Sequence, residues 1–480
     1  MKQSIIQKSK TLCGILVLTG LMAAGTAVRA GVQLPAVFSN NMVLQQQSEV
    51  PVWGWASAAG TVKIVASWSP ADTVKVKATS GGTWMATVRT VKAGGPYSLR
   101  IFTSDADFKE FHNVMLGEVW LCSGQSNMQW SVNHGILNGN EEAEAANRPD
   151  IRIFHIPMRT AETPQNNCDA SWEQCTPEVM RNSSAVAYFF ARRLQDALNV
   201  PVGIVVAAWG GTPYEVWTKS ELIESNPLLK ASSDALNKNP WWPSEPGTCY
   251  NQMIHPIVPY SIAGAVWYQG EANIDRYATY GLGLQTMINC WRSEFKKEFP
   301  FYLVQIAPYT YNSTGNAAAQ LREQQELVTK LVPKTGMAVI SDRVNNVKNI
   351  HPADKQTVGL RLGDLALAEI YGQPLNDCKS PVFLSLKVEK NKAIITFEHA
   401  QSGLKCSGDK IEGLKIADAD GNYVDANGII KGNELIVSSP EVKAPVSVTY
   451  CFDDASTGNL FSGAGLPVAP FRSNRTVSFY

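Results

Sequence analysis

The stretch VMLGEVWLCSGQSNM, residues 114–128, places a continuous apolar run directly before a cluster of small polar residues. Residues 114–121 are typical of a strand that is buried on both faces. The Gly, Ser and Asn residues that follow are also the ordinary residues of a turn. The stretch alone therefore permits two interpretations: a simple turn, or a serine nucleophile presented at the end of a strand, with Ser123 and Ser126 as candidates.

Similar apolar runs recur between residues 113 and 375, alternating with amphipathic helical patterns. The strand-like runs cover 151–156, 200–209, 262–269, 301–307 and 336–342, and the helical patterns cover 183–198, 279–298, 317–332 and 353–372. This alternation predicts an α/β domain whose parallel sheet is covered by helices on both faces. In such sheets functional residues gather at the carboxyl ends of the strands.

The regions on either side of this domain have β character. Residues 31–112 contain short alternating runs separated by Gly- and Pro-containing turns, a pattern that predicts a β sandwich or jelly roll. Residues 376–480 return to short strand-like runs, with DGNY and KGNE as turn signals. We therefore expect two accessory β domains around the α/β domain.

Four of the predicted strand ends carry residues suited to acyl transfer. They present Ser126, the pair Gly210-Gly211, the group Gly270 to Asn273, and a loop that ends at His351. A serine hydroxyl becomes an effective nucleophile when an imidazole removes its proton. The oxyanion that then forms needs hydrogen-bond donors, which glycine N–H groups and an Asn amide can supply. The sequence therefore favours a serine esterase.

Five motifs that occur in one order connect this interpretation with a known protein family. The segments GQSNM, WGGTPYEVW, WYQGEAN, LREQQ and IHPADKQTVG resemble the sialate O-acetylesterase family, within the SGNH/GDSL-like serine esterases. The resemblance covers residues 114–375 and implies an SGNH-type three-layer α/β/α fold. It also implies an enzyme that removes O-acetyl groups from sialic acids with no metal or cofactor. An esterase for acetylated polysaccharides such as xylan, and a glycan-binding protein with weakened catalysis, are the alternatives.

The resemblance also assigns roles to individual residues. It implies that Ser126 is the nucleophile and His351 the general base, and that the Ser126 amide, Gly211 and Asn273 form the oxyanion hole. Gly210 is the alternative to Gly211. The candidate substrate-binding residues are Gln125, Glu271 and Arg322. For Glu271 we also consider hydrogen bonds between the catalytic loops, and for Arg322 an exposed position on a helix.

One position departs from the family pattern. The family usually has an Asp two residues before the catalytic His, and this chain has Asn349 there. An Asp orients the imidazole and stabilises the imidazolium, whereas an Asn can only orient it. Asp342, near the end of the preceding predicted strand, is the nearest upstream acid. The third member of the triad is thus open between Asn349, Asp342 and none.

The N-terminus predicts export. Three lysines precede an apolar stretch at 12–28, and small residues around Ala30 are typical of a signal-peptide cleavage site. An oxidising destination permits disulfides among the eight later cysteines, with Cys168 and Cys175 as the most plausible local pair. Lys and Arg total 42, as do Asp and Glu, so the net charge is zero and gives no electrostatic argument for nucleic acid or a membrane surface.

Overall fold

The computed structural model describes residues 31–479 except 105, 312–314 and 376, so the predicted signal peptide at 1–30 lies outside the described residues. The central sheet confirms the predicted α/β class. Neighbouring strands are parallel except for the last pair, β8 and β9. The strand order is β13 (Thr335–Ala338), β12 (Phe301–Val304), β11 (Gly264–Tyr268), β7 (Asp107–Gly124), β10 (Val202–Ala208), β8 (Arg148–His155) and β9 (Trp172–Cys175).

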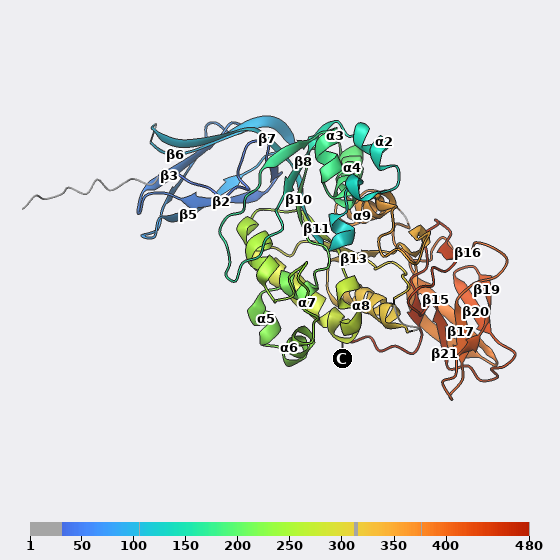
Figure 1. The fold of residues 1–480 in the computed structure, drawn as a ribbon. Helices are drawn as coiled ribbons and strands as arrows, with labels where there is room; N and C mark the ends of the chain where they lie inside the picture. Colours follow the sequence, from blue (N-terminus) through green and yellow to red (C-terminus); the bar gives the residue numbers. More distant parts are fainter. Residues whose placement is uncertain (1–30, 105, 312–314, 376, 480) are drawn as a thin grey trace, which may run out of the picture.

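Four helices cover the two faces of this sheet and complete three layers. Helices α4 (Ala185–Leu198) and α9 (Lys355–Glu369) pack on one face, and α7 (Tyr277–Glu294) and α8 (Ala317–Leu331) pack on the other (Figure 1). Successive residues of β10 point to opposite faces, so Ile204 joins the core under α4 and α9 while Val205 joins the core under α7 and α8. Strands β10, β11 and β12 and the second half of β7 are therefore buried on both sides, as their apolar runs predict.

Shorter helices fill the connections between these elements. They are α1 (Ser126–Gln129), α2 (Gly139–Glu144), α3 (Pro177–Asn182), α5 (Ser220–Glu224) and α6 (Pro227–Asp234). Among the predicted helices, α4 is capped by Ser184, whose hydroxyl accepts a hydrogen bond from the Ala187 N–H at 3.1 Å. The α9 helix is capped in the same way by Asp354, which accepts a hydrogen bond from the Thr357 N–H at 2.9 Å. These side chains satisfy N–H groups that have no partner inside a helix.

The N-terminal β region shares a strand with the central sheet. Strand β7 begins at Asp107, crosses the predicted boundary at 112/113 and ends at Gly124 in the centre of the α/β sheet. Its first half pairs with β6 (Gly94–Ser104) and its middle with β1 (Val43–Gln45). The remaining strands of this region are β2 (Glu49–Trp55), β3 (Thr61–Ala66), β4 (Thr73–Lys77) and β5 (Thr83–Arg89).

The C-terminal β region lies at the opposite end of the molecule (Figure 1) and has its own core. One sheet contains β14 (Val382–Glu389), β15 (Lys392–Glu398), β20 (Glu434–Ser438) and β19 (Asn427–Lys431). A second contains β18 (Val424–Asp425), β17 (Leu414–Ala417), β21 (Ser447–Tyr450) and β23 (Phe471–Arg472), and a pair is formed by β16 (Leu404–Cys406) and β22 (Leu460–Ser462). Buried Arg475 forms a two-pronged ion pair with Glu326 of α8, at 2.7 and 3.0 Å, and so holds this region against the central domain.

The predicted disulfide is wrong in this structure, because all eight cysteines within the described residues are free. Cys168 packs in the core on one side of the sheet and Cys175 in the core on the other. The Cys175 thiol instead donates to the Ala146 carbonyl at 3.6 Å. In the part of the chain that the structure describes, no helix is both long and apolar enough to cross a membrane.

Candidate active site

Three neighbouring strands end at the same level, beside Ser126. Gly124 of β7 pairs in register with Ala208 of β10 and with Tyr268 of β11. The chain then turns, and Ser126 starts α1 directly above the sheet edge. Ser123, the rival nucleophile, lies inside β7 with 0% of its surface exposed. The structure thus places Ser126, and not Ser123, at the edge where the other candidate residues gather.

Ser126 and His351 meet across this edge, although they lie 225 positions apart in the sequence. The Nε2 atom of His351 is 2.9 Å from the Ser126 Oγ, within hydrogen-bonding distance. The imidazole stacks on Trp130, with ring centroids 4.4 Å apart and planes inclined by 24°. Burial and the positive charges of Lys355 and His134 lower the pKa of His351 to about 4. The imidazole is therefore neutral near pH 7, as a general base must be.

Neither candidate for the third triad position contacts the imidazole. The Oδ1 of Asn349 accepts a hydrogen bond from the backbone N–H of His351 at 3.0 Å, so it shapes the loop. Asp342 accepts two hydrogen bonds from Arg361, both at 2.7 Å, and pairs with Arg343. Among the described residues no carboxylate forms an ion pair or hydrogen bond with the His351 ring. The geometry is that of a Ser-His dyad.

A buried polar chain connects the nucleophile turn to the histidine loop. Asn127 donates to Glu271 at 2.7 Å and to the carbonyl of Ile350 at 3.1 Å, and Lys355 donates to its Oδ1. Burial raises the pKa of the Glu271 carboxyl and lowers the pKa of Lys355 to about 7. Glu271 therefore lies in a network that joins the loops of Ser126 and His351, which is one of the two roles considered for it.

The two glycines after β10 are not equivalent. The Gly210 N–H donates to the Gln129 Oε1 at 2.7 Å, whereas no hydrogen bond among the described residues occupies the N–H of Gly211. Gly211 has a φ of 79°, and a Cβ there would lie 2.2 Å from the Trp242 ring. The unoccupied N–H favours Gly211 over Gly210 as the free donor, and the positive φ with the nearby Trp242 ring requires glycine at position 211.

The Asn273 side chain is held in one orientation. Its Oδ1 accepts from Gln269 at 2.7 Å and from the Tyr214 N–H at 3.2 Å, while its Nδ2 donates to Glu215 at 2.9 Å. An amide nitrogen carries two hydrogens, so one remains for a further acceptor. Burial raises the pKa of Glu215 to about 7.

The other two candidate substrate-binding residues form internal contacts. The Gln125 side chain is buried, and its Oε1 accepts from the N–H groups of Gly270 and Ala272 at 3.3 and 3.2 Å. The expectation of an exposed Arg322 is wrong, because 1% of its surface is exposed. Its guanidinium donates to the carbonyls of Asp453 and Asp454, so the C-terminal β region covers it.

Sequence reasoning assigned no role to Asn127, Trp130, Glu215 or Lys355. Asn127, Glu215 and Lys355 nevertheless stand inside the motifs GQSNM, WGGTPYEVW and IHPADKQTVG. Their position inside the family motifs was the feature of the sequence from which a role could have been predicted. Trp130 lies just beyond GQSNM, and its stacking on His351 depends on a contact between distant parts of the chain.

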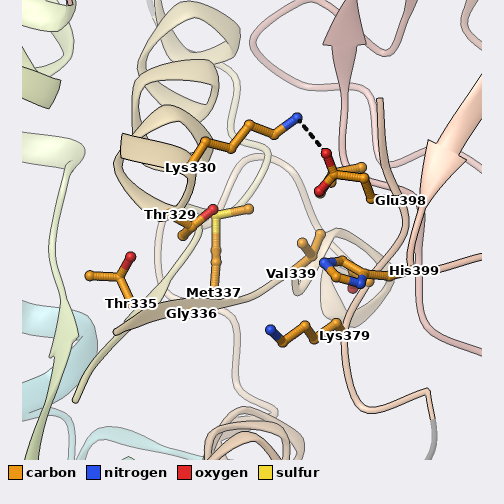
Figure 2. A pocket seen from close by; sticks show the side chains of 11 residues that line it. Thr329, Lys330, Thr335, Gly336, Met337, Val339, Lys379, Glu398 and His399 are labelled. Atoms are coloured by element: carbon orange, nitrogen blue, oxygen red, sulfur yellow. Dashed lines mark ion pairs between the residues drawn. The ribbon is translucent and has the colours of Figure 1, made fainter. Parts of the chain in front are cut away.

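A hollow of about 300 Å³ between α8, β13 and the C-terminal strands lies apart from these residues. Figure 2 shows Lys330 pointing across it towards Glu398, at 3.6 Å, with Lys379 and His399 on the far wall. Lys379 in turn pairs with Glu369. Both lysines of this hollow are thus paired with carboxylates, and the hollow contains none of the predicted site residues.

A three-layer α/β/α fold with a Ser-His pair and a glycine turn at the strand ends defines the SGNH-type class of serine esterases. The family model described as carbohydrate esterase, sialic acid-specific acetylesterase, matches residues 116–366. The chain belongs to this family and is a hydrolase of carboxylic esters.

The similarity to curated relatives and to a solved structure extends over most of the chain. The chain is 30% identical over 422 residues to the sialate O-acetylesterase of Homo sapiens, covering 80% of each chain. It is 31% identical over 423 residues to that of Rattus norvegicus, covering 75% of this chain and 77% of the relative. Among solved structures, a carbohydrate acetylesterase from Xanthomonas citri aligns with a TM-score of 0.83 at 34% identity, covering 93% of this chain and all of the other.

Proposed function

We propose that this protein removes O-acetyl groups from sialic acids through an acetyl-enzyme intermediate on Ser126. The observation that carries the mechanism is the 2.9 Å contact between the Ser126 Oγ and the Nε2 of a His351 that is neutral at pH 7. Family membership supports the substrate class. A glycan-binding protein without catalysis would not need this pair or a neutral imidazole.

The first half of the reaction forms the acetyl-enzyme. As the Ser126 Oγ attacks the acetyl carbonyl carbon, the His351 Nε2 takes its proton. The carbonyl oxygen becomes an oxyanion, and in this proposal the N–H groups of Ser126 and Gly211 and the second N–H of Asn273 donate hydrogen bonds to it. Removing one such donor typically lowers kcat by roughly 10²–10³-fold. The intermediate collapses when His351 returns the proton to the departing sugar oxygen.

The second half releases acetate. Water attacks the acetyl-Ser126 carbonyl while His351 takes a proton from the water, and the proton then returns to the Ser126 Oγ. The imidazolium that forms in each half has no carboxylate partner among the residues that the structure describes. The face of Trp130, at 4.4 Å from the imidazole, attracts a cation instead, a contribution of about 0.5–2 kcal/mol.

The test compares two serines from the same turn. Ser126→Ala should abolish acetate release from O-acetylated N-acetylneuraminic acid and the acetyl adduct seen by mass spectrometry. Ser123→Ala, at the buried rival position, should retain both. Full activity of Ser126→Ala would refute the mechanism. Turnover of acetyl-xylan without turnover of the acetylated sialic acid would move the substrate class to plant polysaccharides.

We also infer that the chain is exported and cleaved near Ala30. The basic residues, apolar stretch and small residues at the N-terminus support this inference. N-terminal sequencing of the protein recovered from the periplasm or culture medium tests it. A mature protein that retains residues 1–30 would contradict it.

A further inference from the structure

A second hollow, of about 290 Å³, adjoins the glycine turn that contacts Ser126. Its inner wall contains Gly211 and Ala272. The preceding Gly210 packs against Ser126, since a Cβ on Gly210 would lie 3.3 Å from the Ser126 Cβ. The Ala272 N–H donates to the side chain of Gln125, the residue before Ser126. The hollow is thus bounded by the two loops that flank the nucleophile.

The outer wall is an aromatic ring held in place by a short loop. Trp242 lies so close to Gly211 that a Cβ there would be 2.2 Å from the ring. The loop is fixed by a backbone bridge from Trp242 to Asn239 and by an ion pair of 2.8 Å between Lys238 and Glu245. A flat, fixed aromatic surface with polar neighbours suits the apolar face of a sugar ring.

Arg276 gives the hollow a cation. Its guanidinium is held by backbone carbonyls, with Nη1 donating to Asp275 at 3.0 Å and Nη2 donating to Ala235. Its Nε is buried and has no hydrogen-bond partner within the described residues. The charge of Arg276 partly offsets the rise in the pKa of the buried Glu215 carboxyl, so it is shared with that group. The remaining N–H groups of a guanidinium fixed in this way are suited to binding a further carboxylate.

We propose that this hollow is the subsite for the sugar that carries the acetyl group, and that the sugar is acidic. In this arrangement Trp242 packs against the ring and Arg276 donates to its carboxylate. Asn239 and Asp275, which also line the hollow, supply acceptors for ring hydroxyls. The proposal rests on the proposed function and adds the residues that select the acid form of the substrate.

The experiment compares kcat/KM for O-acetylated N-acetylneuraminic acid, its carboxyl methyl ester and p-nitrophenyl acetate. In Trp242→Ala and Arg276→Gln, the ratio of the acid to p-nitrophenyl acetate should fall about tenfold or more. Trp241→Ala is the matched control, because Trp241 is 78% exposed and does not line the hollow. Its ratio should stay within about twofold of the wild type.

The methyl ester isolates the role of the carboxylate. The wild type should prefer the acid to the ester, and Arg276→Gln should process both alike. An equal loss on acid and ester in Arg276→Gln, or an equal effect of Trp241→Ala and Trp242→Ala, would overturn the subsite while wild-type sialate turnover persists. If the wild type hydrolyses p-nitrophenyl acetate but no acetylated sialic acid, the proposed function fails and the subsite with it.

Discussion

The environment of His351 predicts activity in acid. With a pKa of about 4, roughly 90% of the imidazole is neutral at about pH 5, whereas an ordinary pKa of 6.5 would leave about 3% neutral. Because only the neutral form can take the Ser126 proton, kcat/KM should keep about nine-tenths of its plateau at about pH 5 and show its acid limb near pH 4. A profile measured with p-nitrophenyl acetate tests this.

A substitution at Lys355 tests the cause of the low His351 pKa. The Lys355 ammonium lies next to His351 and is one cause of the low imidazole pKa, second to burial. Lys355→Gln removes the charge but keeps a donor for Asn127, so the acid limb should move to higher pH. A wild-type limb at pH 6 to 7, or a Lys355→Gln limb that stays in place or moves lower, would refute the reasoning.

Unfolding must be separated from titration in this assay. The folded-state pKa of His351 lies below its unfolded value, so the unfolded chain binds this proton first as the pH falls. The residue therefore destabilises the folded state progressively from about pH 6.5 down to about pH 4, and not above. Circular dichroism at each pH identifies points where activity is lost through unfolding.

Three further predictions concern other contacts. Gly211→Ala should lower the unfolding free energy by roughly 1–3 kcal/mol in urea titrations and reduce kcat, because of the positive φ and the Trp242 ring; unchanged stability would contradict this. Asn349→Ala should lower kcat about tenfold by freeing the His351 loop, whereas Asn349→Asp, which still accepts that N–H, should remain near wild type; equal losses would argue against a loop role. Arg475→Met should cost up to roughly 3–5 kcal/mol in the same titrations, because buried Glu326 would keep only its 3.4 Å ion pair with Lys330, against less than about 1 kcal/mol for Lys387→Met in an exposed pair.

The alternation of apolar strands and amphipathic helices was sufficient to predict the sheet and its covering helices, because both periodicities are local properties of the chain. Contacts between distant segments were not predictable. A charged residue such as Arg322 on a predicted helix is expected to be exposed. It is buried because residues 453 and 454, more than a hundred positions later, pack over it. The order of motifs indicated Ser126 and His351. The residue that pairs with an acidic side chain, however, can be distant in the sequence and is not predictable from its neighbours. Asp342 is taken by Arg361, nineteen positions away.

Because strand β7 belongs to both the N-terminal region and the central sheet, it limits how this enzyme can be shortened or recombined. A cut at 112/113 would divide one 18-residue strand, and the part left behind is the one that leads into the turn with Ser126. That part would also lose β1, whose Val43 pairs with Met115, and the side chain of Gln45, which donates to Glu118 at 2.9 Å. The N-terminal region is thus a non-detachable part of the catalytic sheet, and transplanting the esterase to another protein would require taking it along.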